Sequence, residues 1–293
     1  MITLRDLEFL SSLARRKHFA RAAEDCGVSQ PAFSMRIRNI EEKLNTAVVK
    51  RGNRFQGFTP EGETLLRHAR KITGDLKIME QEFRSARGEV TGNLVIGVIP
   101  TAVIFAARAV NELQTLHPSI TVRLQTETSL AIQQGLENGN YEAGFTYSEG
   151  VSPDLLRIDA LYNETYSLLA PSHLAPRKSG EITWAEAAQL PLCLLEPGMQ
   201  NRRIIDKVFR DLGLVPEVKL ETSGFIAAMV LATEGQSATI VPKILLETFG
   251  NVAGTVALSL SDPILEREVC LVSPIRDPDL PTVAALRGVC QKN

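Results

Sequence analysis

Two short helices joined by a tight turn are the feature of this sequence that most restricts its fold. Apolar residues at helical spacing run from Phe19 to Cys26 and stop at Gly27, a residue type that commonly ends helices. Ser29 can cap a second helix that has Pro31 in its first turn, where the missing proline N–H breaks no helical hydrogen bond. The expected buried stripe of that helix is Phe33, Ile37, Ile40 and Leu44. This pattern predicts a helix-turn-helix.

Another helix is predicted before this pair. Leu4, Leu7 and Leu10 repeat at helical spacing directly after Thr3. Thr3 and Asp6 stand three residues apart, which resembles a capping box. The sequence therefore predicts that the first helix begins at residue 4.

The second helix of the motif exposes side chains that suit a DNA groove. At 100° per residue, the face opposite its apolar stripe carries polar and basic residues, and the first residues of such a helix reach base edges in a major groove. Glutamine can form two hydrogen bonds with adenine, serine can bond a base or a phosphate, and arginine binds phosphates. The candidate DNA-binding residues are Gln30, Pro31, Ser34, Arg36, Arg38, Arg51 and Arg54. The alternative is an ordinary solvated helix surface.

The charges of the chain are divided unevenly along its length. The formal net charge is −2 over 293 residues. Residues 1–88 hold 17 Lys and Arg against 11 Asp and Glu, a net +6, whereas residues 89–293 hold 15 against 23, a net −8. This asymmetry indicates a module that binds a polyanion joined to a part of different function.

A heptad pattern follows the basic segment. Apolar residues spaced four and three apart extend over nearly three repeats, as in a coiled-coil seam. The predicted helix of residues 59–88 would be roughly 40 Å long, so a dimerising helix is favoured over an amphipathic helix docked on one core. The candidate dimerisation residues are Leu65, Ala69, Ile72, Leu76, Met79 and Phe83.

Strands and helices alternate from residue 89 onward, which predicts a parallel α/β sheet in each of two lobes. The first unit has strands near 94–99, 121–126 and 143–146, and the second has strands near 166–170, 191–195, 218–221 and 237–241. A strand at 268–272 then returns to the first unit. We therefore expect lobe I to comprise residues 89–163 and 268–293, and lobe II residues 164–267.

Ligands of open α/β sheets bind at the carboxyl ends of the strands, where helix N-termini offer free N–H groups. The loops at these ends hold the candidate effector-binding residues Pro100, Thr101, Thr128, Ser129, Thr146, Glu196, Gln200, Ser223 and Phe225. Their short hydroxyl groups suit a small polar metabolite or a carboxylate, although Glu196 would repel an anion. The alternative for each Ser or Thr is a plain helix cap.

Several classes of protein are disfavoured. The four histidines are scattered at no metal-ligand spacing, and neither a phosphate-binding G-x-x-x-x-G-K-[ST] loop nor a G-x-S-x-G elbow is present. We expect no enzyme, no cofactor and no metal; the alternative function is an α/β solute-binding protein or small-molecule enzyme. No signal peptide or membrane span is recognised, so a cytoplasmic protein is expected. Redox sensing is an alternative use of Cys193, Cys270 and Cys290, which otherwise are buried thiols.

Five motifs, in order and spacing, resemble the DNA-binding half of LysR-type transcriptional regulators. The most specific is A-A-x-x-x-x-V-S-Q-P-A-x-S, from Ala22 to Ser34, and F-T-P-E-G follows from Phe58 to Gly62. The resemblance implies a winged helix-turn-helix with its wing near Lys50–Phe58. It also implies DNA contacts by Gln30, Pro31, Ser34 and Arg38 of the recognition helix and by Arg51 and Arg54 of the wing. Two departures are His18, where Ser is usual, and Val48-Val49, where an aromatic residue is usual.

The resemblance extends more weakly to the rest of the chain, where Gly235–Pro242 fits a family pattern loosely. It implies a multidomain α+β chain: a winged helix-turn-helix (1–58), a dimerising linker helix (59–88) and a two-lobed α/β effector domain like a periplasmic binding protein (89–293). The implied partners are pseudo-palindromic promoter DNA, a small-molecule effector, a second copy forming a homodimer that assembles to a homotetramer, and RNA polymerase. No membrane is implied.

Overall fold

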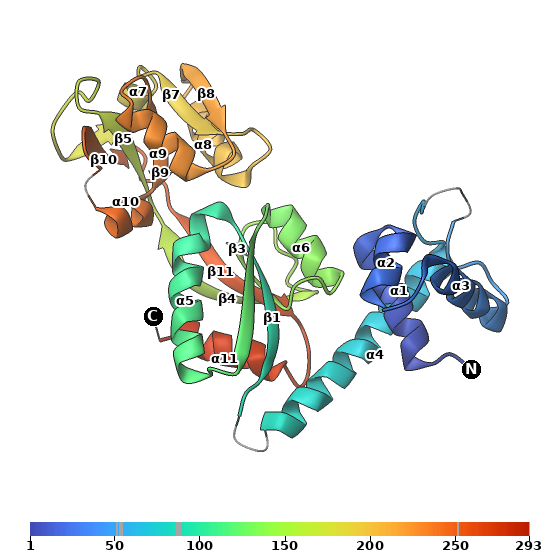
Figure 1. Ribbon diagram of the computed structural model, residues 1–293. Coiled ribbons are helices and arrows are strands. Elements are labelled where there is room, and N and C mark those ends of the chain that lie inside the picture. The colour runs from blue at the N-terminus through green and yellow to red at the C-terminus, as the bar shows by residue number, and fades with distance from the viewer. Residues whose placement is uncertain (51, 53–54, 86–88, 251, 293) are drawn as a thin grey trace.

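The computed structural model describes residues 1–50, 52, 55–85, 89–250 and 252–292. A small helical domain, one long helix and two α/β lobes follow one another (Figure 1). The helices of the N-terminal part are α1 (Leu4–Arg16), α2 (Phe19–Asp25), α3 (Gln30–Leu44) and α4 (Pro60–Ser85). None of the helices in these residues is long and apolar enough to cross a membrane.

Local side-chain caps fix where these helices begin. The Thr3 and Asp6 pair forms the predicted capping box: the Asp6 carboxylate accepts from the Thr3 N–H at 2.9 Å, and the Thr3 hydroxyl accepts from the Asp6 N–H at 3.3 Å. The Ser29 hydroxyl accepts from the Ala32 N–H at 3.4 Å, as predicted for the start of α3. His18, which departs from the family pattern, caps α2 by accepting from the Arg21 N–H.

The helical domain has its own apolar core. Phe33 and Ile40 are fully buried, and Phe33 stacks on Phe9 with ring centroids 4.8 Å apart. The prediction that Leu44 completes the buried stripe is wrong, because Leu44 is 39% exposed. Leu44 is the last residue of α3, where the helix has passed the edge of the core, and Asn45 then turns the chain in a left-handed conformation.

The segment before α4, the expected wing, packs on the helical domain although the aromatic residue that is usual there is missing. Val49 and Phe58 form an antiparallel bridge. Phe55 packs edge-to-face on Phe58 at 5.3 Å and on Phe19 at 6.3 Å, so a different aromatic side chain fills this part of the core. The first turn of α4 needs a glycine at Gly62, where a Cβ atom would lie 2.0 Å from the carbonyl oxygen of Val48.

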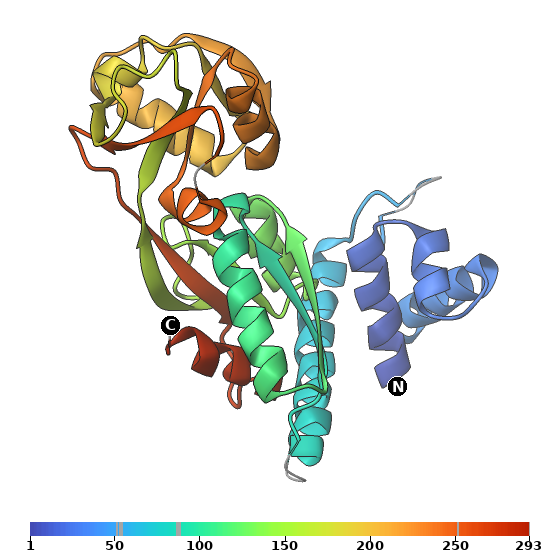
Figure 2. The same cartoon turned by 60° about the vertical axis from the view of Figure 1, so that its left-hand side comes forward.

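Helix α4 packs against both parts of the molecule (Figures 1 and 2). Near its start, Leu66 and Ala69 are buried in the core of the helical domain. Near its end, Ile78 is buried in the core of lobe I. The Lys77 ammonium and the Glu142 carboxylate lie 2.6 Å apart, which ties the helix to the same lobe. The helix is therefore a connector docked on its own chain at both ends.

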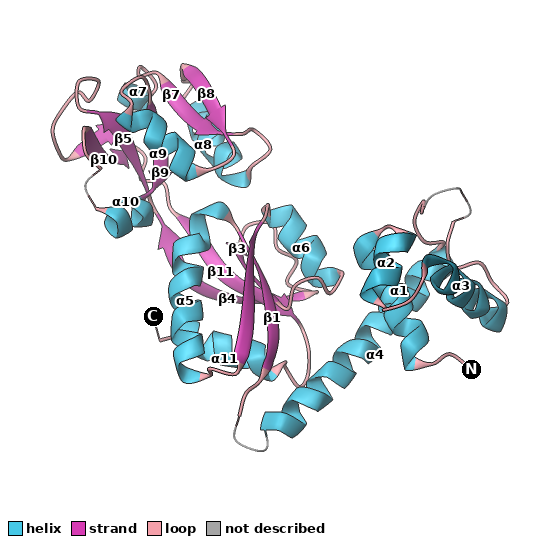
Figure 3. Cartoon of the chain, viewed as in Figure 1, coloured by secondary structure: helices cyan, strands magenta, loops and turns pink. Residues whose placement is uncertain are grey.

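Lobe I contains a five-stranded sheet in the order β2-β1-β3-β11-β4 (Figure 3). The strands are β1 (Gly92–Val98), β2 (Ile120–Thr126), β3 (Ala143–Tyr147), β4 (Leu156–Glu164) and β11 (Arg267–Pro274), with the helices η1 (Pro100–Ala102), α5 (Val103–Leu116), α6 (Ser129–Glu137) and α11 (Pro281–Cys290). The three strands predicted as parallel, β1, β2 and β3, are parallel. The sheet as a whole is mixed, because β11 runs antiparallel to both β3 and β4.

Lobe II contains a six-stranded sheet in the order β6-β10-β5-β9-β7-β8. It is also mixed, since β5 runs antiparallel to β9 and β10. The strands are β5 (Tyr166–Pro171), β6 (Glu181–Thr183), β7 (Leu192–Leu195), β8 (Val218–Thr222), β9 (Ala238–Pro242) and β10 (Thr255–Ser261), with helices α7 (Trp184–Ala187), α8 (Gln200–Asp211), α9 (Phe225–Thr233) and α10 (Lys243–Phe249). The chain crosses between lobes from β4 to β5 and from β10 to β11.

Candidate DNA interface and effector cavity

The N-terminal half of α3 presents several of the predicted DNA-binding side chains to solvent. Gln30, Pro31 and Arg38 are exposed, and Ser34 is half-buried beside them. Met35 lies on the same helix and is 62% exposed. The surface therefore combines hydrogen-bonding, apolar and cationic groups. Arg51 and Arg54 of the expected wing lie outside the described residues.

Arg36 is engaged inside the domain. Its Nε donates to the Asp6 carboxylate at 2.5 Å, and its guanidinium carbon lies 5.9 Å from the centre of the Phe9 ring. Lys43 binds the other oxygen of Asp6 at 2.9 Å. Burial would raise the pKa of Asp6, but hydrogen bonds from the Thr3 backbone, Lys43 and Arg36 outweigh it and hold that pKa at about 2. Arg36 therefore forms part of the α1–α3 contact, and its expected phosphate contact stays a prediction.

The predicted seam of α4 divides into two parts. Ile72, Met79 and Phe83 are 44%, 47% and 73% exposed, so they form an unpartnered apolar row within the described chain. Leu65 and Leu76 are half-buried. Ala69 is fully buried against the core of its own helical domain, so the structure places it in that core and not on the free face of the helix.

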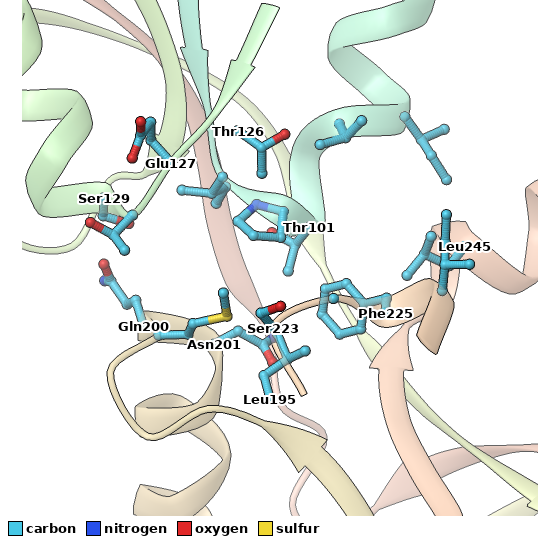
Figure 4. Close-up of a pocket in the computed structure, with 18 of the residues that line it drawn as sticks. Thr101, Thr126, Glu127, Ser129, Leu195, Gln200, Asn201, Ser223, Phe225 and Leu245 are labelled. Carbon is cyan, nitrogen blue, oxygen red and sulfur yellow. The ribbon is translucent and has the colours of Figure 1, made fainter. Parts of the chain in front are cut away.

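A cavity of about 530 Å³ lies between the two lobes. In Figure 4, Thr101 and Glu127 of lobe I face Gln200, Asn201 and Phe225 of lobe II. The predicted residues that line it are Pro100, Thr101, Thr128, Ser129, Gln200, Ser223 and Phe225. The carboxyl ends of strands from both lobes therefore meet at one site, as expected for open α/β sheets.

Two predicted residues lie elsewhere. Thr146 is fully buried and does not line the cavity, whereas the next residue, Tyr147, does. Glu196 is exposed to solvent outside the cavity, whereas Leu195 before it lines the wall. Thr146 and Tyr147 are successive residues of β3, and such side chains point to opposite faces. Glu196 follows Leu195, the last residue of β7, and lies beyond the strand.

The sequence reasoning missed part of the cavity wall. Tyr147 follows the end of the predicted strand, and Asn201 follows Gln200 directly. Leu245 and Phe249 belong to α10, a helix of seven residues that was not predicted. The lining is consequently more apolar than the expected cluster of hydroxyl groups.

A buried polar network connects this cavity to the crossing between the lobes. Glu164, at the end of β4, accepts hydrogen bonds from the hydroxyl groups of Tyr147 at 2.8 Å and Tyr166 at 2.5 Å. The hydroxyl groups of Thr101 and Tyr147 lie 3.2 Å apart. Burial raises the pKa of Glu164 to about 7, although the hydrogen bonds from Tyr166 and Tyr147 oppose this shift. The carboxyl group therefore titrates near neutral pH.

The four cysteine thiols lie in surroundings that favour their protonated form. Cys193, Cys270 and Cys290 are buried, and Cys26 is half-buried. Burial raises the pKa of all four thiols, to about 12 for Cys270 and Cys290. Reactive cysteines instead have a depressed pKa in electropositive, accessible surroundings.

An exposed recognition helix, a connecting helix and a two-lobed domain with an interlobe cavity together define the class of ligand-responsive DNA-binding regulators. The family model of the bacterial regulatory helix-turn-helix protein, lysR family, matches residues 4–63, and the LysR substrate binding domain matches residues 87–293. The chain therefore belongs to the LysR family of transcriptional regulators.

Individual relatives agree with this assignment. The chain is 31% identical over 192 residues to a hydrogen peroxide-inducible genes activator of Haemophilus influenzae, covering 65% of this chain and 61% of that relative. It is 26% identical over 238 residues to the HTH-type transcriptional regulator CfxR of Cupriavidus necator, covering 80% and 75% of the two chains.

Two solved structures share the fold over nearly the whole chain. A single-residue variant of full-length OxyR from Pseudomonas aeruginosa superposes with a TM-score of 0.78 at 20% identity, covering 99% of this chain and 94% of that one. Full-length CbnR in complex with its target DNA superposes with a TM-score of 0.64 at 20% identity, covering 99% of both chains.

Proposed function

We propose that this regulator binds pseudo-palindromic promoter DNA through two copies of α3 and responds to a small molecule held between lobes I and II. The cavity carries this proposal, because its lining comes from both lobes and a bound ligand would therefore change their relative orientation. We further propose that the chain has no enzymatic activity and that RNA polymerase is its partner at the promoter.

The proposed dimer joins two chains along the exposed row of α4. Ile72, Met79 and Phe83 offer apolar side chains that this chain leaves uncovered, and burying them would stabilise a helix pair. Two recognition helices held in this way can reach half-sites in successive major grooves. A homotetramer formed from two such dimers is the further assembly that we propose.

Footprinting on promoter fragments selected from random genomic DNA tests the DNA-binding part. We expect protection of paired half-sites, with an affinity that falls about a thousandfold or more between 50 and 200 mM salt. Gln30→Ala should reduce the preference for selected over random DNA, because Gln30 reads a base edge in the proposal. Glu61→Gln, an exposed change at the start of α4, is the control. Equal affinity for random and selected fragments would contradict the proposal.

Peroxide sensing is a second candidate function, because one relative carries that role in its name. We infer that this regulator does not sense peroxide through its cysteine thiols. A peroxide-reactive thiol must ionise readily, whereas burial raises the pKa of every cysteine thiol in this chain. The small-molecule proposal is therefore preferred.

A further inference from the structure

The charges around the interlobe cavity restrict the kind of molecule that it can hold. Among the described residues that line it, Glu127 is the single Asp, Glu, Lys, Arg or His. The buried carboxyl group of Glu164 lies behind the wall, since it accepts a hydrogen bond from the hydroxyl group of Tyr147, a residue of the lining. A ligand carboxylate would thus meet two acidic groups and no basic side chain of the described lining.

The basic residue that directly follows the lining in sequence does not offset the acidic charge around the cavity. Arg202 follows Asn201, but its guanidinium is buried and donates to the Asp206 carboxylate and the Glu221 carboxylate, each at 2.8 Å. It also donates to the carbonyl oxygen of Leu195 at 2.7 Å. Two acidic partners already neutralise this cation, so it is not available to a ligand in the cavity.

Hydrogen-bonding groups are nevertheless unused at the polar end of the cavity. The side chain of Asn201 is buried, with a residue exposure of 5%, and neither its amide nitrogen nor its carbonyl oxygen forms a well-aligned hydrogen bond within the described chain. The Ser129 hydroxyl, also at this wall, is buried without a hydrogen bond. The Tyr147 hydroxyl donates to Glu164, so its oxygen acts as an acceptor, and the Thr101 hydroxyl already lies 3.2 Å from it. These groups fit a ligand end that both donates and accepts.

Much of the remaining wall is apolar. Phe225 and Leu245 are buried in lobe II, whereas Ile226 and Phe249 are 71% and 59% exposed where they line the cavity. Ile104 adds an apolar side chain from lobe I. Such a surface gains free energy when an apolar ligand body covers it, and a volume of about 530 Å³ suits a molecule of two or three rings or a comparable chain.

We propose that the cavity binds an uncharged, mainly apolar molecule with one end that both donates and accepts hydrogen bonds, such as a primary amide or an alcohol, and that it discriminates against carboxylates. The inference rests on the proposed function, because it takes this cavity as the effector site. The N-termini of α8 and α9 have no side-chain cap and can donate to the oxygen of that polar end. They do so without requiring a full negative charge, which Glu127 opposes.

Isothermal titration of the full chain with three matched probes tests the proposal: 2-naphthamide, 2-naphthoate and 2-(aminomethyl)naphthalene share one apolar body and differ in the charge of one end. We expect the amide to bind at least about tenfold more tightly than the carboxylate. Glu127→Gln should improve carboxylate binding about threefold to tenfold and leave amide binding unchanged. Glu196→Gln, a neighbouring exposed acid outside the cavity, is the matched control and should change neither.

Asn201→Leu tests the polar end. The substitution keeps the branched shape and the number of side-chain heavy atoms, and it removes an amide that forms no well-aligned hydrogen bond among the described residues. Folding should therefore be preserved while amide binding weakens about tenfold. Carboxylate or ammonium binding as tight as amide binding would overturn the ligand class but leave the cavity as an effector site. Binding of none of the probes at 1 mM would overturn both the ligand class and the cavity as the effector site.

Discussion

A single buried carboxylate links two helices of the DNA-binding domain. Asp6 serves both as the partner in the capping box of α1 and as the common acceptor for Arg36 and Lys43 of α3. The same group therefore fixes the start of one helix and its contact with the recognition helix. Its folded-state pKa of about 2 lies below the ordinary value of 3.8, so ionised Asp6 stabilises the fold.

Asp6→Asn should loosen this contact. The shift of the Asp6 pKa corresponds to about 2 kcal/mol, so we expect amides of α1 and α3 to exchange with deuterium about thirtyfold faster near pH 7. Because the folded pKa is depressed, this stabilisation is present above pH 4 and is lost as the pH falls from about 4 to 2. Glu24→Gln changes an exposed acid of α2 in the same domain, and exchange at the same sites should match that of the unmodified chain. Unchanged exchange in Asp6→Asn would show that Arg36 does not hold the two helices together.

The cysteines give a second prediction for single residues. With thiol pKa values of about 12 at Cys270 and Cys290, thiolate is scarce at neutral pH and the thiols should react slowly with Ellman's reagent until the chain is unfolded. Micromolar hydrogen peroxide should leave DNA affinity unchanged. A chain with all four cysteines replaced by serine or alanine should keep its response to the effector. Loss of the response in that chain, with folding intact, would restore a redox role.

At the level of elements, several local signals that agree made a prediction secure, whereas some edge strands and short helices were missed. Helix α3 was found because its cap, first-turn proline and apolar stripe agree. Strand β4 was missed because it is an edge strand with scattered burial, and α10 was missed because seven residues are too few to establish a helical period. Strand β10 does alternate, with Leu258 and Leu260 buried, and could have been predicted from that pattern.

Sheet geometry explains which cavity-lining residues were predicted correctly and which were not. Loops after parallel strands necessarily meet at one edge, so Thr101, Thr128 and Gln200 could be predicted from strand order. The direction of the side chain could not be predicted for Thr146 in β3 or for Glu196 directly after β7. Strands β3 and β7 are buried on both faces, so an alternating pattern that would distinguish one face from the other is missing.

Helix α4 provides a prediction about assembly. Phe83 is 73% exposed near the end of the helix, and Ile264 is 70% exposed between β10 and β11. Under the proposed pairing, Phe83→Glu should place a charge in the dimer seam and raise the dimer dissociation constant at least about tenfold. Ile264→Glu makes the same chemical change at a similarly exposed site and should leave the constant unchanged. Sedimentation equilibrium measures both; equal effects of the two substitutions would exclude α4 as the seam.

For the whole molecule, Glu164 places a titratable group at the crossing between lobes. The carboxyl group accepts from Tyr147 of lobe I and from Tyr166, the first residue of β5 in lobe II. Both the cavity and the relative position of the lobes therefore depend on this one acceptor. Its raised pKa means that the folded chain prefers the protonated acid, so ionisation of Glu164 opposes folding.

Glu164→Gln should remove that pH dependence. In the unmodified chain the stability associated with Glu164 is greatest below the ordinary pKa of 4.5 and is lost as the pH rises through about 7, by about 3 kcal/mol in total. The single tryptophan, Trp184, is fully buried in lobe II and reports its thermal unfolding by fluorescence. We expect the unfolding temperature of the unmodified chain to fall mainly between about pH 4.5 and 7, the two pKa values of this group, and that of Glu164→Gln to change less. Glu142→Gln, a partly exposed carboxylate paired with Lys77, is the control and should retain the fall. If the unfolding temperature changed with pH in the same way in the unmodified and Glu164→Gln chains, other groups would determine the pH dependence of lobe II. Protonation of Glu164 would then not couple the two lobes.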